Sequence, residues 1–306
     1  MAYLKILIYA LATFMATSTL VFADDDDDDD GDIEIPFAEA FLYFELNDTD
    51  GDLGIHGKID GDAWKVMEIE DPWERTLLKV KARGRLKRQG MTELFFESAE
   101  PCFPTDDECD DPLDPDDFFA RFPEGEYEIE GETLEGDELE NEVWLSHIIP
   151  AAPVVEVNDV ASASREVCGC DVEDLDEGEV CEALPTAFHP VTLSWAAVDS
   201  SHALKHAPDG LGEDGLIEVR YYEVVVEIDE TDFKSTSIVP PNVLSWEIPG
   251  AFLLLSDRIK YEVLVRTNVI GEDGTVVMGE IDGEPGPLPG NVSALESCFE
   301  VIPPPV

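Results

Sequence analysis

Hydrophobic and polar residues alternate with a period of two along most of the chain from residue 33 onward. This pattern is typical of β-strands that bury one face. It is clearest in four segments near the start, residues 33–46, 64–71, 76–87 and 92–101. No long hydrophobic stripe with the helical period of 3.6 residues occurs. We therefore predict an all-β protein in which short strands and turns build β-sandwiches.

One β-hairpin is predicted from the pattern alone. Tyr127 and Ile129 alternate with glutamates, Gly136 and Asp137 offer a turn, and a second alternating segment follows to residue 148. Alternating segments joined by a glycine-containing turn are the usual signal for a hairpin.

The N-terminus has the pattern of a signal peptide. Lys5 is the only charge near the start, an apolar run covers residues 6–22, and the segment from Val21 to Ala23 fits signal-peptidase cleavage. The apolar run is short for a membrane span. No second apolar run follows, so we predict no membrane span after cleavage and an exported protein, periplasmic or extracellular.

Composition and turn residues divide the chain into five predicted segments. An acidic connection that contains cysteines separates two β-rich regions. A length of 306 residues is also enough for two domains. We predict a signal peptide at 1–23, a disordered acidic spacer at 24–32, an N-terminal β-sandwich at 33–152, the connection at 153–184 and a second β-sandwich at 185–302.

The second β-rich region resembles a fibronectin type III domain. Trp195 lies where that family has a core tryptophan, Tyr222 opens a strand of alternating valines, and Tyr261 resembles the tyrosine that precedes the sixth strand. The segments that carry the resemblance are 189–199, 217–229, 233–250 and 258–277. The resemblance implies a seven-stranded sandwich used for spacing or binding, and no catalytic residue. For the N-terminal domain we predict an immunoglobulin-like sandwich.

The charge of the chain narrows the choice of partners. Seventy-one acidic residues against eighteen lysines and arginines give a net charge of −53. Such a surface repels nucleic acid and anionic membranes, so we exclude both as partners. It attracts divalent cations and basic proteins.

A loop rich in aspartate is the first candidate site. Asp48, Asp50 and Asp52 have the alternating spacing of calcium ligands, and Asp60 and Asp62 are placed to complete the shell. The pattern departs from an EF-hand, which needs glycine at its sixth position and glutamate at its twelfth. The alternative is a hairpin turn whose aspartates bond their own backbone. We keep both interpretations, calcium being the only cofactor suggested.

A cluster of cations is the second candidate site. The period-two pattern predicts that these cations lie on one face of a single strand. We expect them to form cross-strand ion pairs with the glutamates of residues 126–132 in the same domain. The other interpretation is docking of this face on an acidic partner or a second copy of the chain. The predicted face consists of Lys79, Lys81, Arg83, Arg85 and Lys87.

Six cysteines in an exported chain predict disulfides. Cys102 and Cys109 lie in one acidic loop and form the first predicted pair. Cys298 must reach back to Cys168, Cys170 or Cys181. We name Cys181, which would join the two ends of the second domain, although spacing does not choose among the fifteen possible connectivities. Zinc at Cys168 and Cys170 is disfavoured because a single residue separates them.

No motif of nucleophilic, phosphate-binding or metalloprotease chemistry occurs in the sequence. We therefore predict an exported acidic protein with a binding or structural role, stabilised by disulfides and calcium, without catalysis, and with no partner named by the sequence. A carbohydrate- or surface-adhesion module is the first alternative, with Trp64, Trp73 or Trp144 stacking on sugars. A hydrolase that uses carboxylates is the second, and a pocket with facing carboxylates would favour it.

Overall fold

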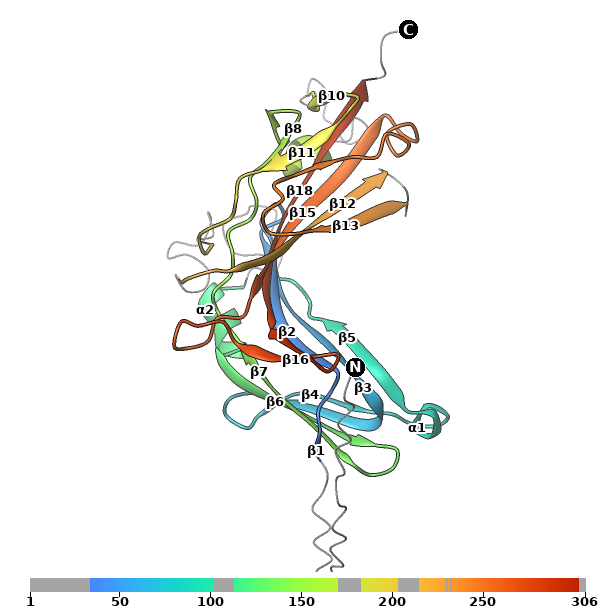
Figure 1. Cartoon of the computed structure of the whole chain (residues 1–306), viewed down its shortest axis with the longest axis vertical. Coiled ribbons are helices and arrows are strands. Elements are labelled where there is room, and N and C mark those ends of the chain that lie inside the picture. The colour runs from blue at the N-terminus through green and yellow to red at the C-terminus, as the bar shows by residue number, and fades with distance from the viewer. Residues whose placement is uncertain are drawn as a thin grey trace, which may run out of the picture. The chain divides into compact units, whose positions relative to one another are not determined.

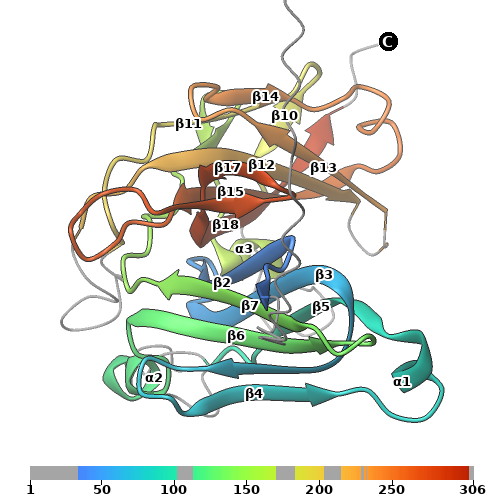
Figure 2. The same ribbon diagram turned by 60° about the horizontal axis from the view of Figure 1, so that its bottom comes forward.

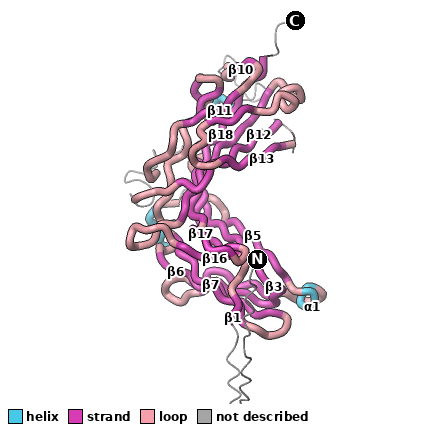
Figure 3. The backbone as a smooth tube through the Cα atoms, in the orientation of Figure 1, coloured by secondary structure: helices cyan, strands magenta, loops and turns pink. Residues whose placement is uncertain are grey.

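The computed structural model describes residues 34–101, 113–169, 183–202, 215–228, 231 and 233–302. Strands dominate these residues, and the three helices are short (Figure 3). The all-β prediction is confirmed. Of the described helices, none has the length and apolar character that a bilayer span requires.

The elements up to residue 145 enclose the first core. β3 bends within residues 60–64, where its pairing shifts; its first half pairs with β2 and β5, and its second half with β4 and β6 (Figure 2). These elements are β1 (Glu34–Ile35), β2 (Glu39–Asn47), β3 (Asp52–Glu70), β4 (Thr76–Lys81), α1 (Leu86–Gln89), β5 (Met91–Glu97), α2 (Pro115–Arg121), β6 (Gly125–Thr133) and β7 (Glu138–Leu145).

Alternation along these strands sends large side chains into one core. Trp64, Tyr127 and Phe44 are fully buried there. The hydroxyl of Tyr127 donates a hydrogen bond to the Pro123 carbonyl at 3.0 Å, so this polar group is satisfied inside the core. The predicted hairpin is confirmed, because β6 and β7 pair antiparallel around a turn in which Gly136 has a φ of 107°.

The remaining elements build a second core between two sheets, apart from β16 (Met278–Ile281) and β17 (Glu284–Pro287), which pair only with each other as a separate two-stranded sheet. Trp195 and Tyr222 are buried in the second core with ring centroids 5.4 Å apart. The other elements are β8 (Val155–Val157), β9 (Val160–Ala161), α3 (Arg165–Gly169), β10 (Thr186–Phe188), β11 (Thr192–Trp195), β12 (Val219–Ile228), β13 (Lys234–Val239), β14 (Ser245–Glu247), β15 (Arg258–Asn268) and β18 (Pro289–Ile302).

These elements form a sandwich around the second core. One layer has the strand order β14-β11-β8-β9, and the other contains β18, β15, β12 and β13. Trp195 and Tyr222 come from opposite layers, as expected for a sandwich in which both inner faces are apolar. The fibronectin type III resemblance remains a prediction.

A single strand joins the two β-rich regions. β18 pairs antiparallel with β15 over most of its length and parallel with β2 at Val292, Ser293 and Ala294. One twelve-stranded sheet therefore contains strands from both regions (Figure 1). The buried side chains nevertheless form two clusters, and the predicted domain boundaries remain predictions.

Candidate functional site

One face of the long sheet can be followed across four strands through cross-strand pairs. Glu45 of β2 pairs with Val292 of β18, which pairs with Arg266 of β15, which pairs with Tyr221 of β12. Because directly paired residues project to the same side of a sheet, these side chains share one face. The opposite face of β12 and β15 is the one buried in the second core.

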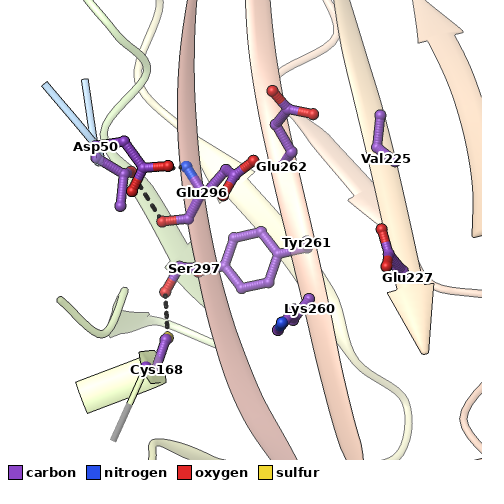
Figure 4. A pocket seen from close by; sticks show the side chains of 11 residues that line it. Asp50, Cys168, Val225, Glu227, Lys260, Tyr261, Glu262, Glu296 and Ser297 are labelled. Atoms are coloured by element: carbon purple, nitrogen blue, oxygen red, sulfur yellow. Dashed lines mark hydrogen bonds between the residues drawn. The ribbon is translucent and has the colours of Figure 1, made fainter. Parts of the chain in front are cut away.

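Two adjoining pockets on this face form what we call the acidic groove. Their volumes are about 370 Å³ and 280 Å³, and both are lined by Val225 and Glu262. Figure 4 shows the larger pocket, in which Glu262 and Glu296 come from neighbouring strands. The carboxylates that line the acidic groove are Asp50, Glu45, Glu223, Glu227, Glu262 and Glu296.

Glu262 is the most perturbed of these carboxyl groups. Burial raises its pKa to about 8, and the nearby charges of Glu296, Glu45 and Glu223 contribute to the rise. Each of these effects disfavours the ionised form. A bound cation would favour ionisation of Glu262, so the acidic groove is electrostatically suited to positively charged groups.

Among the residues that the structure describes, three cations line the acidic groove, namely Lys234, Lys260 and Arg266, and Lys234 lowers the pKa of Glu262. The guanidinium of Arg266 lies 3.9 Å from the ring centroid of Tyr43, and its Nε donates to the Gly290 carbonyl at 3.2 Å. Within the described part of the chain, the buried Nη2 atom of Arg266 has no hydrogen-bond partner. Arg266 lowers the pKa of Glu45 and of Glu223, although burial raises both and is the larger effect. One arginine thus offsets only part of the negative charge.

A disulfide closes one end of the acidic groove. Cys168 of α3 is bonded to Cys298 of β18 with a Cα–Cα distance of 5.7 Å, and Cys168 also lines the larger pocket. The prediction that Cys298 pairs with Cys181 is therefore wrong. The 130-residue separation gives no local spacing signal, which is why the sequence could not select Cys168. Cys102, Cys109 and Cys181 lie outside the described residues.

The first three predicted calcium ligands lie at the turn between β2 and β3. The side chain of Asn47 accepts hydrogen bonds from the backbone N–H groups of Thr49 and Asp50, which is an Asx turn. Asp48 contacts His202, with 2.7 Å between Oδ1 and Nε2. These contacts give the turn a structural role, with Asn47 rather than an aspartate bonding the backbone.

Asp60 and Asp62 lie further along β3. Asp60 pairs with Glu39 and Asp52 pairs with Asn47, at opposite ends of the β2–β3 ladder. At about 3.3 Å per residue, the distance from Asp52 to Asp60 is roughly 26 Å. The structure therefore does not bring the five aspartates to one point. Calcium binding by the turn alone stays a prediction.

The predicted basic face is divided between three elements. β4 ends at Lys81, Arg83 and Arg85 follow in a turn where Gly84 has a φ of 60°, and Lys87 lies in α1. The expectation of one strand bearing all five cations is wrong, because a positive φ at Gly84 ends the extended conformation. Lys79 forms an ion pair with Glu68 of β3. β3 separates β4 from β6, so the acid opposite Lys79 comes from β3 rather than from the glutamate-rich strand.

Sequence reasoning missed one cluster on the same sheet face. His56 of β3 lies directly opposite Glu97 of β5, and Glu100 follows that strand. Among the described residues these three form the only group of three or more histidine, cysteine or acidic side chains whose ligand atoms all lie within 4.8 Å. Their sequence spacing follows no metal-binding motif, because the strand register brings them together.

The three tryptophans considered for sugar stacking differ in exposure. Trp64 is fully buried and Trp144 is partly buried, whereas Trp73 is 59% exposed. Arg75 covers the Trp73 ring at 4.4 Å from its centroid. A stripe of these three rings on one surface is therefore excluded.

Comparisons with known proteins identify no family. A scan against family models finds no match, and a search of curated proteins finds none either. Among solved structures, one match comes from work titled "Structural insight into host cell surface retention of a 1.5-MDa bacterial ice-binding adhesin", with a TM-score of 0.20 and 10% identity. It covers 88% of this chain and 66% of that chain, just under two thirds of its length. A likeness at this TM-score supports no conclusion about function.

Proposed function

We propose that this chain is an exported, non-catalytic binding protein whose acidic groove holds a positively charged segment of a partner protein. The observation that carries the proposal is the row of carboxylates on one sheet face, with Glu262 at its centre. With a pKa of about 8, the ionised form of Glu262 is strongly destabilised by burial and by the neighbouring carboxylates. A lysine or arginine side chain placed there supplies the missing positive charge.

The dimensions of the acidic groove suit a peptide segment better than an isolated ion. Its two pockets are each a few hundred cubic ångströms and lie side by side on an open sheet face. The net charge of −53 would speed the approach of a basic partner through long-range attraction. This association should weaken as salt is added, because ions screen exposed charges.

Export is supported by two observations. The N-terminus has the signal-peptide pattern, and the Cys168–Cys298 disulfide suits an oxidising compartment. The partner is therefore sought outside the cytoplasm, in the periplasm or beyond the cell. The carbohydrate-binding alternative has less support, since Trp64 is buried in the core.

Binding of a fluorescent oligolysine peptide tests this proposal. We expect the double variant E262Q/E296Q to weaken binding at least ten-fold, because it removes the Glu296 carboxylate and the carboxyl group of Glu262 that a bound lysine would cause to ionise. The matched control E126Q/E128Q removes two exposed charges from β6. It should change the dissociation constant less than two-fold. Equal losses in both variants would mean that total charge, and not the acidic groove, attracts the peptide.

A hydrolase is the second candidate, because the acidic groove contains two facing carboxylates. Glu262 and Glu296 are direct cross-strand partners on β15 and β18. With a pKa of about 8, Glu262 is protonated at neutral pH and suited to act as a general acid opposite a carboxylate. Such pairs cleave glycosidic bonds in many enzymes. A panel of chromogenic glycosides distinguishes the candidates: turnover that E262Q abolishes favours the hydrolase, and no turnover with intact peptide binding favours the binding protein.

A further inference from the structure

The group of His56, Glu97 and Glu100 lies on the same sheet face as the acidic groove but on β3 and β5. His56 is only 5% exposed, whereas Glu97 and Glu100 are exposed and approach the imidazole from the solvent side. The Nε2 atom of His56 lies 3.3 Å from Oε1 of Glu100. In a tetrahedral site with bonds of about 2.0–2.2 Å, ligand atoms lie about 3.3–3.6 Å apart. The observed separation matches one edge of such a site.

The second ring nitrogen of His56 provides an independent observation. Within the part of the chain that the structure describes, Nδ1 is buried and has no hydrogen-bond partner. It lies 3.7 Å from Oε2 of Glu45, just beyond hydrogen-bond range. A neutral imidazole that donates from Nε2 to Glu100 turns the lone pair of Nδ1 toward the Glu45 carboxylate, which is unfavourable. The opposite tautomer turns Nδ1–H toward Glu45 and frees the Nε2 lone pair for a cation.

We propose that His56, Glu97 and Glu100 are ligands of a divalent transition-metal ion of the zinc class, with Glu45 orienting the imidazole from behind. Histidine bound through one nitrogen while the other donates to a carboxylate is a recurrent arrangement in zinc sites. One nitrogen and two carboxylate oxygens leave one position for water. This site adjoins the acidic groove and shares Glu45 with its lining, whereas the three proposed ligands lie outside the groove.

The surroundings hold the ligands in place before an ion binds. Tyr43 stacks on the imidazole with centroids 5.3 Å apart, and Phe95 packs against its edge at 6.1 Å. Glu100 lies over Gly54, where a Cβ atom would come within 2.8 Å of the Glu100 Cγ atom. A larger residue at position 54 would therefore displace one ligand.

The local charge favours a cation at this position. Three carboxyl groups, those of Glu45, Glu97 and Glu100, lie around the His56 imidazole. A nitrogen ligand distinguishes the site from calcium and magnesium sites, which use oxygen ligands. Zinc, cobalt and nickel accept imidazole together with carboxylates, so we expect binding in the presence of excess magnesium.

Calorimetric titration of the chelator-treated full chain with zinc tests the proposal, with excess magnesium present to occupy diffuse acidic sites. We expect one tight site, and at least ten-fold weaker binding in E97Q and in E100Q. The matched control is E93Q, which removes the same charge from the same face of β5, four residues from Glu97. Its zinc affinity should change less than two-fold.

NMR of the imidazole nitrogens adds a second measurement. Zinc that is attracted loosely to surface carboxylates would not change it. Zinc should shift the Nε2 resonance of His56 and leave the other four histidines unshifted. G54A should weaken zinc binding through Glu100 without removing any ligand, and H56Q should abolish it. Equal zinc affinity in wild type, E93Q, E97Q and E100Q would overturn the proposal, and so would zinc binding that magnesium abolishes. Oligolysine binding, measured with chelator present, reports on the acidic groove independently of this result.

Discussion

The Nε2 atom of His202 lies 2.7 Å from Oδ1 of Asp48, and both side chains are largely buried. This contact connects the turn after β2 to the segment that follows β11. The sequence made Asp48 a candidate calcium ligand. The tertiary structure pairs the two residues with each other, which gives each of them a role in holding the fold together.

Removal of either partner should destabilise the protein. We expect H202Q and D48N each to lower the free energy of unfolding by about 1–3 kcal/mol, because each leaves a buried polar group without its partner. The double variant D48N/H202Q should lose less than the sum of the two. Urea unfolding of all four proteins measures the coupling. Strict additivity would show that the contact contributes nothing.

Glu262 should make stability depend on pH. Its folded pKa of about 8 lies above the ordinary value of 4.5, so between these values the folded state holds a proton that the unfolded state has lost. The contribution of Glu262 to stability is therefore greatest below about pH 4.5 and falls as pH rises toward 8, by at most about 1.4 kcal/mol per pH unit.

Thermal melts across this pH range test the assignment. The slope of stability against pH should flatten in E262Q, in which no proton is exchanged at this position. E126Q, an exposed glutamate of β6, is the control and should keep the slope of the wild type. An unchanged slope in E262Q would contradict the raised pKa.

The disulfide should contribute strongly to stability. Its two cysteines are 130 residues apart, and a cross-link over so long a loop restricts the unfolded chain. We expect C168S/C298S to lose about 3–5 kcal/mol in urea unfolding. Peptide mapping under non-reducing conditions should recover Cys298 joined to Cys168. Recovery of a Cys181–Cys298 peptide would show that the pairing differs.

Two tryptophans provide a matched test of the first core. Trp64 is fully buried and Trp73 is 59% exposed. We expect W64A to cost about 3–5 kcal/mol, because it leaves a large cavity. W73A removes only the stacking of Arg75 and should cost about 0.5–1 kcal/mol. Similar losses in the two variants, measured by thermal unfolding, would contradict the burial assignment.

The sequence predicted the local features of this protein well. Alternation identified the all-β class and the β6–β7 hairpin, because the pleat of a strand puts every second residue on one face. The family resemblance placed Trp195 and Tyr222 on strands, where the structure has them, but the structure alone shows that they meet in the second core. Alternation failed at residues 82–87, where Gly84 adopts a positive φ that a pattern of polar and apolar residues does not reveal.

The features that make up the candidate sites were decided by tertiary structure. The pairing of β18 with β2, the choice of Cys168 for Cys298 and the approach of Glu97 and Glu100 to His56 all join residues distant in the sequence. A period of two specifies which face a side chain occupies but not which strand lies beside it. Among so many carboxylates, only burial and neighbouring charge single out Glu262, and both depend on how the strands are assembled.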